Sequence, residues 1–167
     1  MSTETQHYHM SFLSQLGWIR AISDGQALIR LDWNQTGWQS ADRPDNVSRE
    51  TIAQLAEYFA GERQRFALVI NPEGKSAAGK HWLQIMAQIP YGKIVTYSDF
   101  AHAAGFPKAS RAAGSACASN PIPIIYPCHR VVRSDGSLGN YGGGSDLPPP
   151  HQENLARKAA LITLEQH

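Results

Sequence analysis

The residues of this sequence best suited to chemistry are Cys128 and His129, in the run Pro127-Cys128-His129-Arg130. A thiol attacks as its thiolate, and a neighbouring His or Arg is the usual means of lowering its pKa. A lone cysteine is more often a small core residue, but two polar neighbours are poorly suited to a core position. The run therefore predicts an activated thiol. Because Pro127 disfavours a helix before it, we expect the apolar residues 122–126 to arrive extended and to end at Cys128.

Composition and length limit the class of protein. The 167 residues, of which 42% are hydrophobic and 17% charged, fit an ordinary soluble globular protein with one sizeable domain or two small ones. No stretch approaches the roughly 20 apolar residues that span a bilayer. Residues 1–7 lack the basic and apolar regions of a signal peptide. We therefore expect no membrane partner and a cytoplasmic location, with Cys117 and Cys128 both reduced.

Charge is unevenly distributed along the chain, although the formal net charge is only +1. Between residues 90 and 135 the only acidic residues are Asp99 and Asp135, whereas this stretch contains Lys93, Lys108, Arg111, Arg130 and Arg133. This pattern indicates a basic face on the C-terminal half, which suits nucleic acid but is also common on solvated surfaces. The spacings CxxC and HxxxH are absent from the sequence, so we expect no metal site.

The N-terminal half is predicted to mix strands with one helix. Residues 16–33 predict a β-hairpin with a Ser-Asp-Gly turn. A helix is expected from an N-cap at Ser48 to about Ala60, and a short buried strand over residues 66–70. Asn71-Pro-Glu-Gly74 then breaks the chain. We place a domain boundary there, giving an N-terminal domain 1–74 and a C-terminal domain 75–167.

The second half is predicted to be mainly helical. Helices are expected over residues 76–88, with Trp82, Ile85 and Met86 inward, 97–104, with Thr96 as N-cap, 109–119, and 154–166, with Leu155, Ala159 and Ile162 on one face. Two short helices with a Gly-containing turn between them are a helix-turn-helix candidate. Small residues fill the helix 109–119, which allows close packing on another backbone or close approach to DNA. Arg111 on this helix has no carboxylate within four residues.

Several short motifs occur in one order along the chain. They are Ile89-Pro90-x-Gly92, Val95-Thr96-Tyr97, Arg111-Ala112-x-Gly114, Asn120-Pro121, Pro127-Cys128-His129-Arg130-Val131 and Gly139-x-Tyr141-Gly142-Gly143. The set closely resembles the O6-alkylguanine-DNA alkyltransferases, strongly over residues 82–144 and more loosely before them. The resemblance implies an α/β (α+β) fold. Its small N-terminal domain would be ribonuclease-H-like, and its helical C-terminal domain winged-helix-like with a helix-turn-helix.

The resemblance also implies an activity, the direct repair of alkylated DNA. A protein of this family binds double-stranded DNA through the minor groove and rotates O6-alkylguanine out of the stack. The alkyl group then moves to the protein's own cysteine, here Cys128, in a single turnover that needs no cofactor or metal. His129 would act as base through a bridging water, and a carboxylate near the C-terminus would orient it. Aligning the last helix points to Glu165, with Glu153 as the alternative, because the stretch 145–153 is an insertion relative to the family. We expect a monomer.

Further roles follow from the same resemblance. Asn120 would be the hinge between the recognition helix and the active-site segment. Arg111 would take the place of the flipped base, and Tyr97 would crowd the 3′ phosphate. The remaining expected DNA contacts are Ala112, Gly114 and Thr96, and the expected alkyl pocket comprises Tyr141, Gly142, Gly143 and Val131, where the glycines leave room for larger groups. Cys117 is expected to be a packing residue.

Two other classes of function remain as alternatives. A non-catalytic protein that recognises alkylated bases for other repair machinery would not need the thiol. A cysteine hydrolase would use a Cys-His-Glu set but would not need Arg111.

Overall fold

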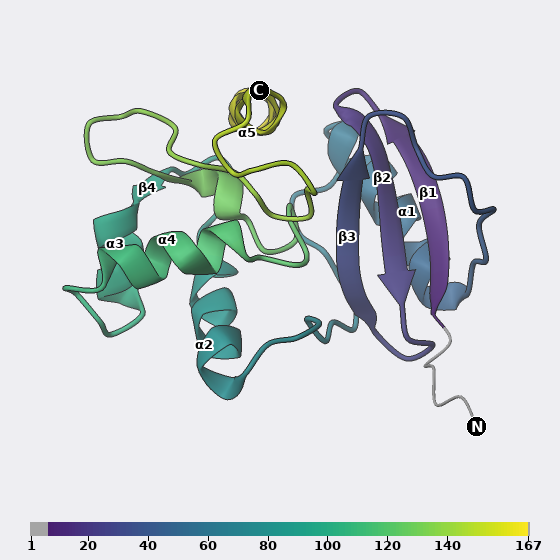
Figure 1. The fold of residues 1–167 in the computed structure, drawn as a ribbon, viewed down its shortest axis with the longest axis horizontal. Helices are drawn as coiled ribbons and strands as arrows, with labels where there is room; N and C mark the ends of the chain where they lie inside the picture. The colour runs from purple at the N-terminus through teal and green to yellow at the C-terminus, as the bar shows by residue number, and fades with distance from the viewer. Residues whose placement is uncertain (1–6, 167) are drawn as a thin grey trace. The chain divides into compact units, whose positions relative to one another are not determined.

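The computed structural model describes residues 7–166, and the chain divides into two compact units, Met1–Glu73 and Gly74–His167 (Figure 1). Both units contain helices and strands, which confirms the predicted mixed α/β class. No helix within the described range is long and apolar enough to cross a membrane.

The first unit is an antiparallel sheet covered on one face by a helix (Figure 1). Its elements are β1 (Tyr8–Ser14), β2 (Gly17–Ser23), β3 (Leu28–Asn34) and α1 (Asn46–Phe59), and the strand order is β1-β2-β3. The predicted hairpin is confirmed as β2 and β3, whereas β1 was not predicted. Its core includes Ile19, Leu31, Leu55 and Tyr58, each at most 1% exposed.

The N-cap of α1 is Asp45, so the prediction of Ser48 was wrong. Asp45 Oδ1 accepts a hydrogen bond from the Ser48 N–H at 2.8 Å, and Ser48 Oγ accepts one from the Asp45 N–H at 2.9 Å. This reciprocal pair is a capping box, in which Ser48 occupies the third helical position. Ser23 Oγ on β2 also donates to Asp45 Oδ2 at 2.7 Å, and this contact favours Asp45 over Ser48 as the cap.

The prediction of a strand over residues 66–70 was also wrong. This segment forms only one isolated bridge, between Ile70 and Leu28 of β3. The buried side-chain amide of Gln54 in α1 replaces a neighbouring strand, because it accepts from the Ala67 N–H at 2.9 Å and donates to the Ala67 carbonyl at 3.1 Å. A side chain therefore satisfies backbone groups that a sheet ladder would otherwise pair.

Within the described residues, the second unit contains four helices and a short parallel strand pair that contacts α3. Its elements are α2 (Ala77–Met86), β4 (Val95–Thr96), α3 (Tyr97–Ala103), α4 (Ser110–Ala118), the 3₁₀ turn η1 (Cys128–Arg130), β5 (Val131–Val132) and α5 (Gln152–Leu164). All four predicted helices are present. Thr96 is the N-cap of α3, as predicted, and forms a capping box with Asp99. β4 pairs with β5, which brings the start of α3 beside the chain that follows Cys128.

Helix α2 packs on an aromatic cluster. Leu83 and Met86 are its buried residues, so the expectation that Trp82 and Ile85 also face the core holds only in part, since both are half-buried. The Trp82 ring lies edge-on to Phe100 and stacked on Phe106, with centroid distances of 5.2 and 5.7 Å.

Helix α5 buries a polar face. The predicted apolar face of Leu155, Ala159 and Ile162 is only half-buried. The buried residues of the helix are instead Asn154, Arg157, Lys158 and Leu161, and the C-cap, Glu165, is buried as well. The prediction was wrong because these polar groups have partners in distant segments, which hydrophobic periodicity does not reveal.

The capping box makes a testable contribution to the first unit. We expect Asp45→Ala to lower the free energy of unfolding by about 1–2 kcal/mol, since it leaves the first-turn N–H groups of α1 without their side-chain acceptor. Urea unfolding followed by circular dichroism measures this loss. The control Asn46→Ala, at the exposed neighbouring position, should change stability by less than about 0.5 kcal/mol. Equal effects of the two substitutions would contradict the assignment.

Candidate active site

Cys128 follows a tight turn and not an extended strand, which corrects the expectation for residues 122–126. Ile124 has a left-handed φ of 72°, and the Tyr126 N–H donates to the Ile122 carbonyl at 3.0 Å. Pro127, at φ −83° and ψ 64°, then forms an inverse γ-turn that the Cys128 N–H closes on the Tyr126 carbonyl at 2.8 Å. The two turns place Cys128 at the start of η1.

The side chain of Asn120, which is 1% exposed, fixes this turn and contacts the thiol. Its Nδ2 donates to the Tyr126 carbonyl at 2.7 Å and to Cys128 Sγ at 3.2 Å, while its Oδ1 accepts from the Ile122 N–H at 3.0 Å. Asn120 follows the C-cap of α4, Ser119. One amide therefore connects the end of α4 to both the turn and the sulfur.

The thiol of Cys128 is protonated at neutral pH. Burial raises the pKa of Cys128 to about 11, although the hydrogen bond from Asn120 and the charge of Lys158 act in the opposite direction. Burial raises the pKa of Cys117 as well. The predicted lowering of the thiol pKa by a neighbouring His or Arg was therefore wrong for this structure: burial outweighs it, and both His129 and Arg130 are engaged by Glu165.

His129 is oriented by Glu165. Nε2 of His129 lies 2.7 Å from Glu165 Oε2, and both side chains are at most 2% exposed. Because a carboxylate accepts, this contact assigns the ring proton to Nε2 and leaves Nδ1 as a lone-pair site. Nδ1 is buried without a hydrogen-bond partner among residues 7–166. Burial also lowers the pKa of His129 against the effect of Glu165, so the imidazole is neutral at neutral pH.

The carboxylate of Glu165 is held from several sides. Arg130 donates to both oxygens, from Nε at 2.8 Å and from Nη2 at 3.0 Å, and the Gly92 N–H donates at 3.2 Å. Arg130 Nη1 also donates to the Ile89 carbonyl at 2.7 Å. Glu153 lies in the first turn of α5, at the opposite end from Glu165, so Glu165 is the carboxylate in contact with His129.

Lys158 is a buried positive charge that lowers the pKa of the Cys128 thiol. It is fully buried, and its Nζ donates to the carbonyls of Leu138 and Asn140 and lies 3.5 Å from the Tyr97 hydroxyl. The sequence motifs did not predict a role for Lys158. Its position could have been found from the helical spacing of Lys158, Leu161 and Glu165, which places two ionisable residues on one face.

The residues expected to contact DNA lie mainly on exposed parts of the second unit. Arg111 and Ala112 are exposed on α4, and Arg111 makes no hydrogen bond or ion pair within the described range. A Cβ added at Gly114 would meet no atom within 4 Å, so this glycine borders open space. Thr96 and Tyr97 are half-buried, and burial raises the pKa of the Tyr97 hydroxyl.

The glycines expected to shape the alkyl pocket differ in their surroundings. A Cβ at Gly143 would lie 3.3 Å from Cys128 Sγ and 3.1 Å from the Asn120 carbonyl oxygen, so Gly143 borders the thiol. A Cβ at Gly142 would lie 2.9 Å from Pro149 Cγ, so Gly142 adds no open space, contrary to our expectation. Val131 and Tyr141, the other two expected members, are buried.

The insertion 145–153 is tied to the loop that carries these glycines. The Tyr141 N–H donates to the Pro149 carbonyl at 3.0 Å, and Asn154 Nδ2 donates to the Pro148 carbonyl at 2.9 Å. The proline-rich stretch therefore packs beside the loop and leads into α5.

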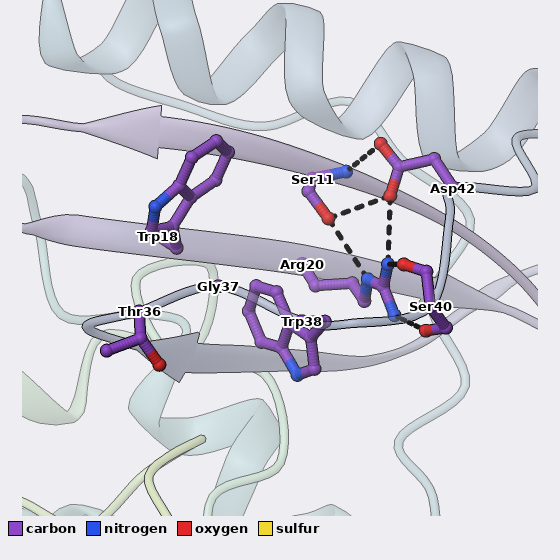
Figure 2. A pocket seen from close by; sticks show the side chains of 8 residues that line it. All are labelled: Ser11, Trp18, Arg20, Thr36, Gly37, Trp38, Ser40 and Asp42. Carbon is purple, nitrogen blue, oxygen red and sulfur yellow. Dashed lines mark hydrogen bonds and ion pairs between the residues drawn. The ribbon is translucent and has the colours of Figure 1, made fainter.

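A separate pocket of about 240 Å³ lies in the first unit, beside the Trp18 and Trp38 rings (Figure 2). The Arg20 guanidinium there donates to Ser11 Oγ, Ser40 Oγ, the Ser40 carbonyl and Asp42 Oδ1. These partners belong to the fold itself, so we assign no chemistry to this pocket.

Comparisons with known proteins identify the chain. Residues 78–167 match the family model for the DNA binding domain of 6-O-methylguanine DNA methyltransferase. The constitutive methylated-DNA–protein-cysteine methyltransferase of Bacillus subtilis is 39% identical over 132 residues, covering 79% of this chain and 72% of the relative. The Methanosarcina acetivorans protein of the same name is 38% identical over 146 residues, covering 84% and 92%. This chain belongs to the methylated-DNA–protein-cysteine methyltransferase family.

Structure comparison agrees with this assignment to the methylated-DNA–protein-cysteine methyltransferases. The Mycobacterium tuberculosis OGT solved in complex with DNA has a TM-score of 0.79 and 31% identity, covering 95% of this chain and 92% of that one. The resemblance found in the sequence motifs is confirmed. The part matched by the family model runs from α2 to the C-terminus and contains Cys128, His129 and Glu165.

The raised pKa of the Cys128 thiol can be tested in this methyltransferase family member when no DNA is bound. In protein labelled with ¹³C at the cysteine Cβ, we expect neither cysteine signal to titrate between about pH 6 and about pH 9, because burial disfavours the thiolate. NMR measures this, and Cys117→Ala assigns the two signals. A Cys128 midpoint near or below the free-cysteine value of about 8.5 would contradict the prediction.

Proposed function

We propose that this protein repairs O6-alkylguanine in double-stranded DNA by transferring the alkyl group to Cys128, once per molecule. The observation that carries the proposal is the set of hydrogen bonds made by Asn120, His129 and Glu165 near the thiol. Cys128 Sγ accepts from Asn120, and the adjacent His129 has one nitrogen fixed by Glu165 and the other without a partner in the described structure. A protein that only recognised alkylated bases would need neither this nitrogen nor the thiol.

Proton transfer to His129 starts the reaction. The buried thiol is protonated, so it must lose its proton as the substrate reacts. His129 Nδ1 accepts this proton through a bridging water, while Glu165 stabilises the imidazolium that forms. Because Nε2 is held by Glu165, Nδ1 remains the acceptor throughout.

Alkyl transfer then proceeds by displacement at carbon. The thiolate forms a sulfur–carbon bond as the bond from that carbon to guanine O6 breaks, and the electron pair passes into the guanine ring. The guanine gains one proton at N1, which balances the proton lost by the thiol. The thioether product does not hydrolyse readily, so Cys128 is consumed and the turnover is single.

DNA would bind on the face of α4 that carries Arg111, Ala112 and Gly114, with Thr96 and Tyr97 beside it. A helix with open space at Gly114 can approach the floor of the minor groove closely, and Arg111 can replace the flipped base in the stack. The two units would then correspond to the ribonuclease-H-like and the winged-helix-like, helix-turn-helix parts of the family, divided near residue 74. We propose that the protein acts as a monomer in the cytoplasm.

Stoichiometric transfer tests this function. Incubation with a duplex containing O6-methylguanine should add one methyl mass to the peptide that contains Cys128, and repair should stop at one equivalent. Peptide mass spectrometry measures both. Cys128→Ala should still bind the duplex but repair nothing, because the thiol is the acceptor and not a DNA contact. Methylation of Cys117 instead, or repeated turnover by one molecule, would refute the proposal.

The role of His129 predicts a pH dependence. We expect His129→Gln to lower the single-turnover transfer rate by about 10²–10⁴ near pH 7.5, because a positioned base is lost. Its residual rate should rise about tenfold per pH unit towards pH 9, since the thiolate fraction of a thiol with a pKa of about 11 grows in that proportion. The wild type should depend less on pH. A variant with the wild-type rate and pH profile would exclude His129 as the base.

A further inference from the structure

A groove of about 310 Å³ lies between α2 and α4 in the second unit. Ala112, Ser115 and Ser119 form its α4 side, and they share one helix face because they are three and four residues apart. On the α2 side, a Cβ at Gly79 would lie 3.1 Å from Lys75 Cδ. The missing side chain therefore leaves space for the stem of Lys75 to cross towards α4.

Lys75 brings a positive charge into this groove. Its Nζ donates to Ser119 Oγ at 2.7 Å, and it forms no ion pair within residues 7–166. An ammonium group has three donors, so donors remain for another acceptor. Asp99 is the only acidic residue between Gly74 and Ser134, and its carboxylate accepts from the Thr96 N–H at 3.1 Å. The chemistry of the groove therefore favours an anion.

The groove adjoins the face of α4 that would meet DNA. Ala112 is exposed on α4 and also lines the groove, and the neighbouring Arg111 is exposed as well. A DNA strand in contact with these two residues passes the opening of the groove. Phosphodiester oxygens accept hydrogen bonds from both ammonium and hydroxyl groups. Trp82, Leu83 and Ala116 also line the groove, and these apolar side chains suit a deoxyribose.

We propose that this groove binds one backbone phosphate of the DNA strand that lies along α4, with Lys75 Nζ and the Ser115 hydroxyl as donors. The proposal rests on the proposed function and adds a DNA contact outside the residues assigned above. It makes Lys75 a contact to the DNA backbone, which contributes to affinity without reading sequence.

The variant Lys75→Gln tests the proposal, because it removes the charge and keeps a side chain able to reach Ser119. Fluorescence anisotropy with a labelled duplex should show a Kd about three- to tenfold higher than wild type. The slope of log K against log salt should become shallower by about 0.9, the value for one lost phosphate contact. Lys80→Gln is the matched control, since Lys80 is exposed on α2, shortly after Lys75 in the sequence, but does not line the groove. It should keep the wild-type slope.

The variant Ser119→Ala separates a DNA contact from a structural link. If Lys75 binds phosphate, Ser119→Ala keeps the wild-type salt slope, because the ammonium remains in the groove. If Lys75 only ties α2 to α4, Lys75→Gln leaves the slope unchanged and both variants lower the melting temperature alike, which would overturn the proposal.

Alkyl transfer to Cys128 distinguishes this failure from failure of the proposed function. Wild-type protein that transfers methyl from neither a duplex nor free O6-methylguanine base would refute the function itself. Wild-type transfer together with an unchanged salt slope in Lys75→Gln would refute only the groove.

Discussion

The active site depends on one buried carboxylate, that of Glu165. Removing a carboxylate from water costs several kcal/mol unless its oxygens receive hydrogen bonds and a countercharge. Here the Gly92 N–H, His129 and the guanidinium of Arg130 supply them. These donors come from the segment after α2 and from the turn that contains the thiol, while Glu165 itself ends α5. The carboxylate of Glu165 therefore connects three segments that are distant in the sequence. The same contacts fix the orientation of His129.

Burial of the thiol also explains why the proposed reaction needs a base. A permanently ionised cysteine would be exposed to oxidation, and susceptibility follows thiolate character. Burial keeps Cys128 protonated, and the neutral His129 beside it has an open acceptor nitrogen. The positive charge of Lys158 favours the thiolate once the proton leaves. In the proposed reaction, Cys128 is therefore stored in its unreactive form and ionised only when a substrate is present.

Local sequence patterns predicted the elements of the second unit well, because helix caps and small residues act over a few positions. Thr96 as N-cap of α3 is an example. Local sequence patterns failed where a polar residue has a partner that is distant in the sequence. Asp45 and Ser48 are both good caps, and the contact that favours Asp45 comes from Ser23 on β2, which is distant in the sequence. The buried face of α5 has the same cause, since Lys158 is satisfied by carbonyls at residues 138 and 140. Ordered motifs pointed to the site, but the role of Arg130 required the fold.

The small residues of α4 are compatible with both uses that the sequence left as alternatives, close packing and the proposed approach to DNA. Ala113 and Cys117 are buried, so one face packs closely inside the second unit. Ala112 and the open space at Gly114 lie on the outside, where a bulky side chain would keep a ligand at a distance. Because α4 has small side chains on both its buried and its exposed face, its exposed face can lie close to the thiol. Asn120, which follows the C-cap of α4, donates to Cys128 Sγ and so connects the helix to the thiol. The packing and the proposed DNA contact are therefore consequences of one constraint, the thickness of this helix.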